Sequence, residues 1–197
     1  SFSYTARMRP HPTLTTKLMA TGFAFLVLAM ISIGLTLWVT WKLEGGAAAV
    51  NEAGRLRMYT VRMALALETH DTVRLQTITK DFDNSLNLLS LGTSMRPLFV
   101  PWSDDARARF EALRHQWTGL RHAWSAPTKP ETAILVAQAD AFVDSVNRFV
   151  DAIEAQIARW TAALHVFQIF MMGMAVVGSA VFMTMSFLLV LAPLSRM

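Results

Sequence analysis

A short stretch of helical character, residues 51–63, carries three arginines and a glycine in the order NEAGRLRMYTVRM. Arg57 falls in line with small and β-branched residues at spacings of three and four, which is typical of a packing face. A guanidinium group is planar and donates hydrogen bonds in a fixed fork, so it suits a small planar oxyanion better than an ammonium group does. The stretch therefore indicates anion binding by Arg57, with space provided by Gly54 one turn earlier.

The helix that carries Arg57 has two apolar faces and so needs two neighbours. One face can pack on the rest of its own domain, and the other on the same helix of a second subunit across a two-fold axis. On that axis Arg57 would meet its own copy, and a bound anion would offset both the charge repulsion and the desolvation cost. The face toward the second subunit contains Ala47, Val50, Gly54, Arg57, Val61 and Ala64, and the face toward the domain contains Leu56, Met63 and Leu67.

An alternative without a ligand is that Arg57 forms a salt bridge inside its own domain. The partner would be one of three carboxylates, Asp140, Asp144 or Asp151. The protein would then be a structural, membrane-anchored assembly module.

Two long segments without charged residues, 18–41 and 160–195, predict transmembrane helices. About 20 apolar residues of helix cross a bilayer core, and each segment is long enough. A signal peptide cleaved near Ala47–Ala49 is the alternative for the first segment, but a second span follows it. The hydrophobic fraction of 53% and the mean hydropathy of +0.36 agree with a membrane protein.

The distribution of charge predicts the orientation in the membrane. All acidic residues lie between Glu44 and Glu154, and the basic residues outside residues 42–160 account for the net charge of +4. Basic flanks stay in the cytoplasm, so both termini are expected inside and the intervening segment outside the bacterial inner membrane. No basic stripe interleaved with aromatic residues suggests a nucleic-acid partner. The basic residues that flank the segment 42–160 in the sequence are Arg7, Arg9, Lys17 and Arg196.

The predicted fold is an all-α membrane protein in which two transmembrane helices flank an extracytoplasmic up-down-up-down four-helix bundle. Helices are expected from Thr72 to Leu91, ended by Gly92, and from Ser103 onward. A capping-box pattern at 128–131 predicts the start of the fourth helix, with Pro130 in its first turn. The predicted parts are a cytoplasmic segment (1–17), a first span (18–41), the outer bundle (42–160), a second span (161–191) and a truncated HAMP-like linker (192–197).

No pattern in the chain predicts catalysis, a cofactor or a metal ion. There is no nucleophile–base pair, phosphate loop or kinase motif, and there are no cysteines. His115 and His122 lie seven residues apart, whereas zinc-binding histidine pairs on a helix lie four apart. The segment itself is therefore not expected to be an enzyme.

Residues 51–62 resemble the P-box of the NarX/NarQ nitrate/nitrite sensor histidine kinases, and a related outer domain occurs in type IV pilus chemotaxis transducers. The resemblance implies that nitrate or nitrite binds at the homodimer axis, held by Arg57, with close backbone approach at Gly54. Arg55 replaces a serine of the family pattern and is expected to add positive charge beside the site. The remaining motif positions, with supporting roles, are Asn51, Ala53, Met58 and Arg62.

The expected function is the sensing module of a two-component nitrate/nitrite sensor, embedded in inner-membrane lipid, that signals by helix displacement. The resemblance implies a parent protein-histidine kinase and a cytoplasmic response regulator as its partner. The alternative is the sensor part of a chemotaxis-type transducer for another small anion or an amino acid.

Overall fold

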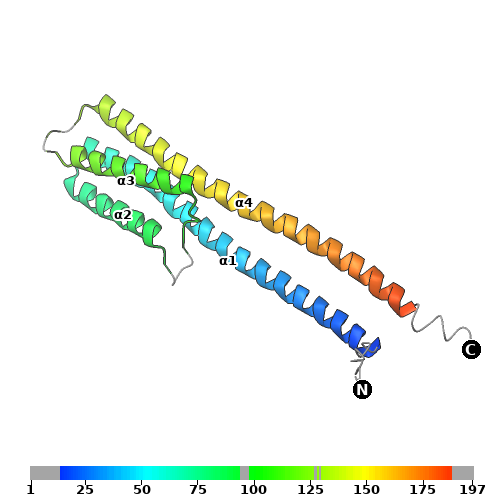
Figure 1. Cartoon of the computed structure of the whole chain (residues 1–197). Coiled ribbons are helices and arrows are strands. Elements are labelled where there is room, and N and C mark those ends of the chain that lie inside the picture. The colour runs from blue at the N-terminus through cyan, green and yellow to red at the C-terminus, as the bar shows by residue number, and fades with distance from the viewer. Residues whose placement is uncertain (1–13, 94–97, 127, 129, 188–197) are drawn as a thin grey trace, which may run out of the picture. The chain divides into compact units, whose positions relative to one another are not determined.

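A computed structural model describes residues 14–93, 98–126, 128 and 130–187 of the chain. Four helices make up nearly all of this part: α1 (Leu14–Glu68), α2 (Thr72–Leu91), α3 (Asp104–Trp124) and α4 (Thr132–Ser186), shown in Figure 1. The described residues contain no strand, and Thr93 and Leu98 form an isolated bridge. The prediction of an all-helical fold is confirmed.

The chain divides into two compact units, Ser1–Leu37 and Trp38–Met197. In the first unit, the described part of α1 exposes large apolar side chains such as Phe23 and Leu26. Both α1 and α4 contain segments that are long and apolar enough to cross a membrane. The predicted first span (18–41) falls in α1, and the second (161–191) falls in α4 as far as Ser186, with residues 188–191 outside the described residues. The predicted HAMP-like linker at 192–197 lies outside the described residues.

The second unit has one hydrophobic core to which all four helices contribute. In Figure 1, α2 and α3 lie beside the C-terminal part of α1 and the N-terminal part of α4. Aromatic rings from three helices meet in the core, and the centroids of Phe82 and Trp117 are 4.1 Å apart. Fully buried side chains at its centre include Leu56, Met63, Phe82, Leu89, Leu113, Leu135, Val146, Phe149 and Ile153.

Helix α2 has the bounds that its sequence predicts. At its start the side chain of Asp71 accepts a hydrogen bond from the backbone N–H of Arg74 at 2.9 Å, which satisfies one free donor of the first turn. At its end Gly92 has a φ of 69° and donates its N–H to the carbonyl of Leu88. A positive φ together with a ψ of −178° is a backbone conformation that glycine adopts most easily.

Helix α3 begins as predicted, but α4 does not. The Ser103 hydroxyl accepts the N–H of Ala106 at 3.1 Å and caps α3. Helix α4 begins at Thr132, because Glu131 has an extended backbone with a ψ of 144° and makes no side-chain cap. The predicted capping box with Pro130 in the first turn is therefore wrong. Thr132 instead donates its hydroxyl to the carboxylate of Glu68 at the end of α1, and a negative charge is favourable at a helix start.

The loop that follows α2 packs against the end of the core. Leu98 and Val100 are buried, and the Trp102 ring lies 5.3 Å from that of Phe110. Phe99 packs on Trp41 at 5.0 Å, and a side chain at Gly45 would overlap its ring. The loop therefore fixes the chain between α2 and α3 against α1, whose next turns carry the candidate site.

Candidate functional site

The α1 segment with the motif has one buried face and one exposed apolar face. Leu56 and Met63 are fully buried, as predicted for the face toward the rest of the domain. On the opposite side Met58 is 44% exposed and Val61 is 59% exposed. Gly54 lies half-buried between these two sides. This side of α1 is therefore exposed and carries large apolar side chains.

Arg57 lies at the border of this exposed face, next to α4. Its Nη1 donates to Oδ1 of Asn147 at 3.1 Å. Within the described residues it forms no ion pair, so the alternative salt bridge to Asp140, Asp144 or Asp151 is wrong. An amide oxygen is a neutral acceptor, and the positive charge of Arg57 therefore has no countercharge bonded to it.

The guanidinium of Arg57 lies over Gly54. A Cβ added at Gly54 would come 3.2 Å from Nη2 of Arg57, with no other heavy atom within 4 Å outside the helix's own backbone. Side chains of helical residues point back toward the preceding turn, so Arg57 naturally covers this position. A glycine here leaves open space beside a guanidinium that has several N–H donors still available.

Arg55 differs from Arg57 because its charge is already paired. Its Nη1 lies 3.1 Å from Oε2 of Glu52, and its Nη2 donates to the Tyr59 hydroxyl at 2.7 Å. Attraction to the Glu52 carboxylate is the main reason that the pKa of Arg55 is raised above its ordinary value. The positive charge that Arg55 adds beside the site is therefore offset by the carboxylate of Glu52.

Glu52 is a buried charged residue that sequence reasoning did not select. It is 6% exposed, and its Oε1 accepts the hydroxyl of Ser85 on α2 at 2.5 Å. The spacing of Glu52 and Arg55, three residues on a helix, was a signal that could have indicated this pair. Asn147 left no such signal, since it lies 90 residues from Arg57 in the sequence.

The other motif residues divide between the core and the surface. Ala53 is fully buried and lets the helices of the core approach closely. Asn51, Met58 and Arg62 are exposed on α1. Among the described residues, no group of three or more histidine or acidic side chains is placed to hold a metal ion. What the site offers is one exposed guanidinium over a glycine, at the edge of an apolar face.

Comparison with known protein families gives one match, and it covers just over half of the chain. The family is described as the type IV pili methyl-accepting chemotaxis transducer N-terminal domain (PilJ), and it matches residues 38–142. The match begins at Trp38, the residue at which the second compact unit begins. A search of curated proteins finds no match. The family favours the chemotaxis-type alternative over the expected nitrate/nitrite sensor kinase. The chain belongs to the family of type IV pili methyl-accepting chemotaxis transducer N-terminal domains.

Proposed function

We propose that the protein is the sensor module of a chemotaxis-type transducer, with an up-down-up-down bundle outside the bacterial inner membrane and both termini in the cytoplasm. Family membership supports the sensor role, and the two apolar helices support membrane anchoring. Aromatic residues and a lysine gather where the spans would leave the bilayer. Trp38 stacks on Trp160 at 6.3 Å, and Nζ of Lys42 lies 4.6 Å from the Phe99 ring centroid. Such groups are typical of a membrane interface.

The ligand that we propose is a small planar oxyanion, with nitrate as the first candidate and nitrite as the second. The observation that carries the proposal is the contrast between Arg55, bound to a carboxylate, and Arg57, bound to a neutral amide. A guanidinium without a countercharge on a surface that becomes buried favours an anion. The three oxygens of nitrate lie in one plane and match the planar fork of N–H donors of Arg57. The resemblance of residues 51–62 to the P-box adds support for nitrate in particular.

We propose further that the site is completed by a second copy of the chain. The exposed face with Met58, Val61 and Leu65 would pack on its copy across a two-fold axis. The Arg57 side chains of the two copies border this face, and one anion could then accept hydrogen bonds from both. Without an anion their charges would repel each other.

Anion binding would alter the contact between α1 and α4, because Arg57 is hydrogen-bonded to Asn147 on α4. Both helices contain candidate membrane spans, so a displacement between them would reach the cytoplasm. A chemotaxis-type signalling unit is the output that the family supports. A histidine kinase with its response regulator is the second candidate, and its support is the P-box resemblance alone.

The test is a set of thermal melts of the whole chain in lipid nanodiscs, with nitrate, nitrite or chloride. Nitrate at 100 times its dissociation constant should stabilise the folded protein by about 2.7 kcal/mol. Arg57→Ala should abolish this shift while leaving the domain folded, since no carboxylate loses its partner. Arg57→Lys should keep the charge but lose most of the response, because the planar fork is gone.

Arg74→Ala is the matched control, because it removes an exposed arginine of α2 that lies outside the motif. It should respond to nitrate as the wild type does. A nitrate shift that persists in Arg57→Ala, or that chloride reproduces in the wild type, would refute this ligand site.

A further inference from the structure

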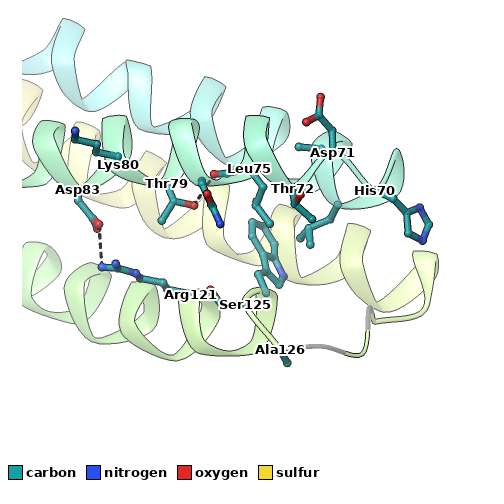
Figure 2. A pocket seen from close by; sticks show the side chains of 14 residues that line it. His70, Asp71, Thr72, Leu75, Thr79, Lys80, Asp83, Arg121, Ser125 and Ala126 are labelled. Carbon is teal, nitrogen blue, oxygen red and sulfur yellow. Dashed lines mark hydrogen bonds and ion pairs between the residues drawn. The ribbon is translucent and has the colours of Figure 1, made fainter.

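A second site candidate is a groove between α2 and α3 near the end of α1, on a different side of the domain from Arg57. Figure 2 shows the residues that line it, from Lys80 and Asp83 near one end to His70 and Ala126 near the other. Its volume is about 590 Å³, which falls in the range of small-molecule sites, about 300–1,000 Å³. Apolar side chains that line it include Leu67, Leu75 and Trp124.

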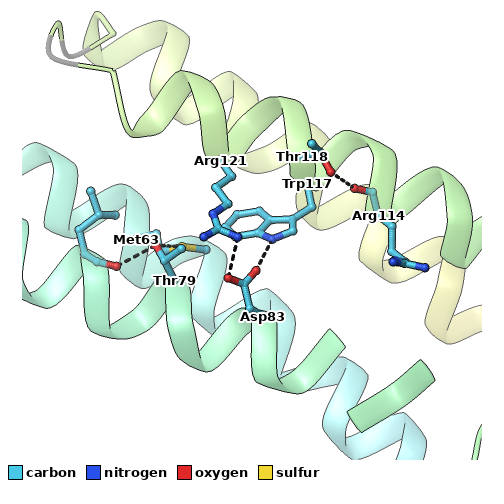
Figure 3. Close-up of polar contacts among 8 residues, drawn as sticks. Met63, Thr79, Asp83, Arg114, Trp117, Thr118 and Arg121 are labelled. Atoms are coloured by element: carbon cyan, nitrogen blue, oxygen red, sulfur yellow. Dashed lines mark hydrogen bonds and ion pairs between the residues drawn. The ribbon is translucent and has the colours of Figure 1, made fainter. Parts of the chain in front are cut away.

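The groove is held open at one end by a polar bridge between α2 and α3. Asp83 on α2 accepts two bonds from α3: Nη1 of Arg121 lies 2.8 Å from one carboxylate oxygen, and Nε1 of Trp117 donates to the other at 2.8 Å (Figure 3). A smaller cavity of about 350 Å³, lined also by Asn87 and Arg114, lies at the same bridge. The bridge fixes the spacing of the two helices, so the groove exists before any ligand enters.

Two carboxylates and two basic side chains line the groove, and they differ in what they bond to. Both oxygens of Asp83 are occupied by Arg121 and Trp117, and Asp71 caps α2. Lys80 has no ion pair or hydrogen bond within the described part of the chain. Arg121 has five N–H donors, and the structure uses Nη1 for Asp83. Among the described residues, the bridge end of the groove therefore carries one positive charge without a bonded partner, that of Lys80, and the Asp71 carboxylate lies toward the other end (Figure 2).

We propose that this groove binds a small organic carboxylate with an apolar body. The carboxylate would accept hydrogen bonds from Lys80 and from the remaining N–H groups of Arg121. The apolar body would lie along Leu75 and Trp124 and be removed from water. Nitrate has no apolar part, so this ligand class differs from that proposed for Arg57, and the two sites are independent.

The experiment measures the binding of hexanoate and acetate to the whole chain in nanodiscs by isothermal titration calorimetry, with empty nanodiscs as the blank. Hexanoate should bind about tenfold more tightly than acetate or better, because its additional CH₂ groups are buried. Lys80→Gln should weaken hexanoate binding about tenfold, because a charge-assisted hydrogen bond is lost. Arg74→Gln, on the same helix but outside the groove, is the control for Lys80→Gln and should bind hexanoate as the wild type does.

A second pair of variants tests the place of binding without removing a charge. Gln76 lines the groove and is exposed, so Gln76→Trp should fill it and abolish hexanoate binding. Thr77→Trp, at the next position and outside the groove, should leave binding unchanged. Arg57→Ala should also leave it unchanged. Equal binding of acetate and hexanoate by the wild type, or wild-type affinity in Lys80→Gln or Gln76→Trp, would overturn the proposal.

Discussion

The pair formed by Arg55 and Glu52 should respond asymmetrically to mutation, because its two members differ in burial. The side chain of Arg55 is 50% exposed, whereas that of Glu52 is 8% exposed. Arg55→Met keeps most of the apolar stem but leaves a buried carboxylate with Ser85 as its remaining donor. A buried polar group that loses a partner costs about 1–3 kcal/mol. Since water reaches the Arg55 side of the pair, we expect the lower part of that range, about 1–2 kcal/mol.

Glu52→Gln should cost much less, within about 0.5 kcal/mol, although it changes the more buried residue. The glutamine oxygen can accept from Arg55 or Ser85, and Arg55 can be solvated if the bond is lost. The double variant should be more stable than Arg55→Met alone, because no buried charge remains without its partner.

Melts of the three variants in nanodiscs, followed by tryptophan fluorescence, measure these differences. For a chain of this size each kcal/mol shifts Tm by about 2–4 °C, so Arg55→Met should lower Tm by roughly 2–8 °C. Arg55→Met should still respond to nitrate, because Arg57 is intact. Equal destabilisation by Arg55→Met and Glu52→Gln, or no recovery in the double variant, would refute the reasoning.

Three further predictions concern the faces of α1. Gly45→Ala should destabilise the domain by about 1–3 kcal/mol, because its Cβ would overlap the Phe99 ring. Gly54→Ala should leave the free energy of unfolding unchanged or raise it by up to about 1 kcal/mol through helix propensity, while weakening the nitrate response by displacing Arg57. Equal melting temperatures of the two variants would contradict at least one of these expectations. The wild type has no cysteine, so Val61→Cys, on the exposed face, should crosslink to its copy in membranes far more than Ala137→Cys on α4. Comparable yields would place the interface elsewhere.

The helices that the sequence predicts correctly are those with local signals at their ends. Ser103 caps α3 through Ala106, three residues away, and Gly92 ends α2 through Leu88, four residues away. The start of α4 depends instead on Thr132 and Glu68, which are 64 residues apart in the sequence. A capping-box pattern describes only local partners, and here a tertiary contact takes the hydroxyl at the start of the helix.

The partners of the two arginines show the same limit inside the candidate site. Arg55 and Arg57 are two positions apart, so on a helix with 3.6 residues per turn they point about 200° apart around the axis. Arg55 therefore meets Glu52 and Tyr59 on the side toward α2, while Arg57 meets Asn147 on α4. In the sequence motif, Arg55 and Arg57 belong to one basic cluster. The packing of neighbouring helices decides that one charge is paired and the other is available.

On the proposed function, the position of the available charge would suit the site to signalling. The bond between Arg57 and Asn147 joins α1 to α4, and these are the two helices with candidate membrane spans. The proposed anion would bind the N–H donors that Asn147 leaves open, so the same guanidinium would contact both the ligand and α4. A ligand shifts a conformational equilibrium only by its differential affinity for the two states. A shift of the guanidinium toward the anion would change its bond to Asn147, and the two arrangements of α1 and α4 would then differ in their affinity for the anion.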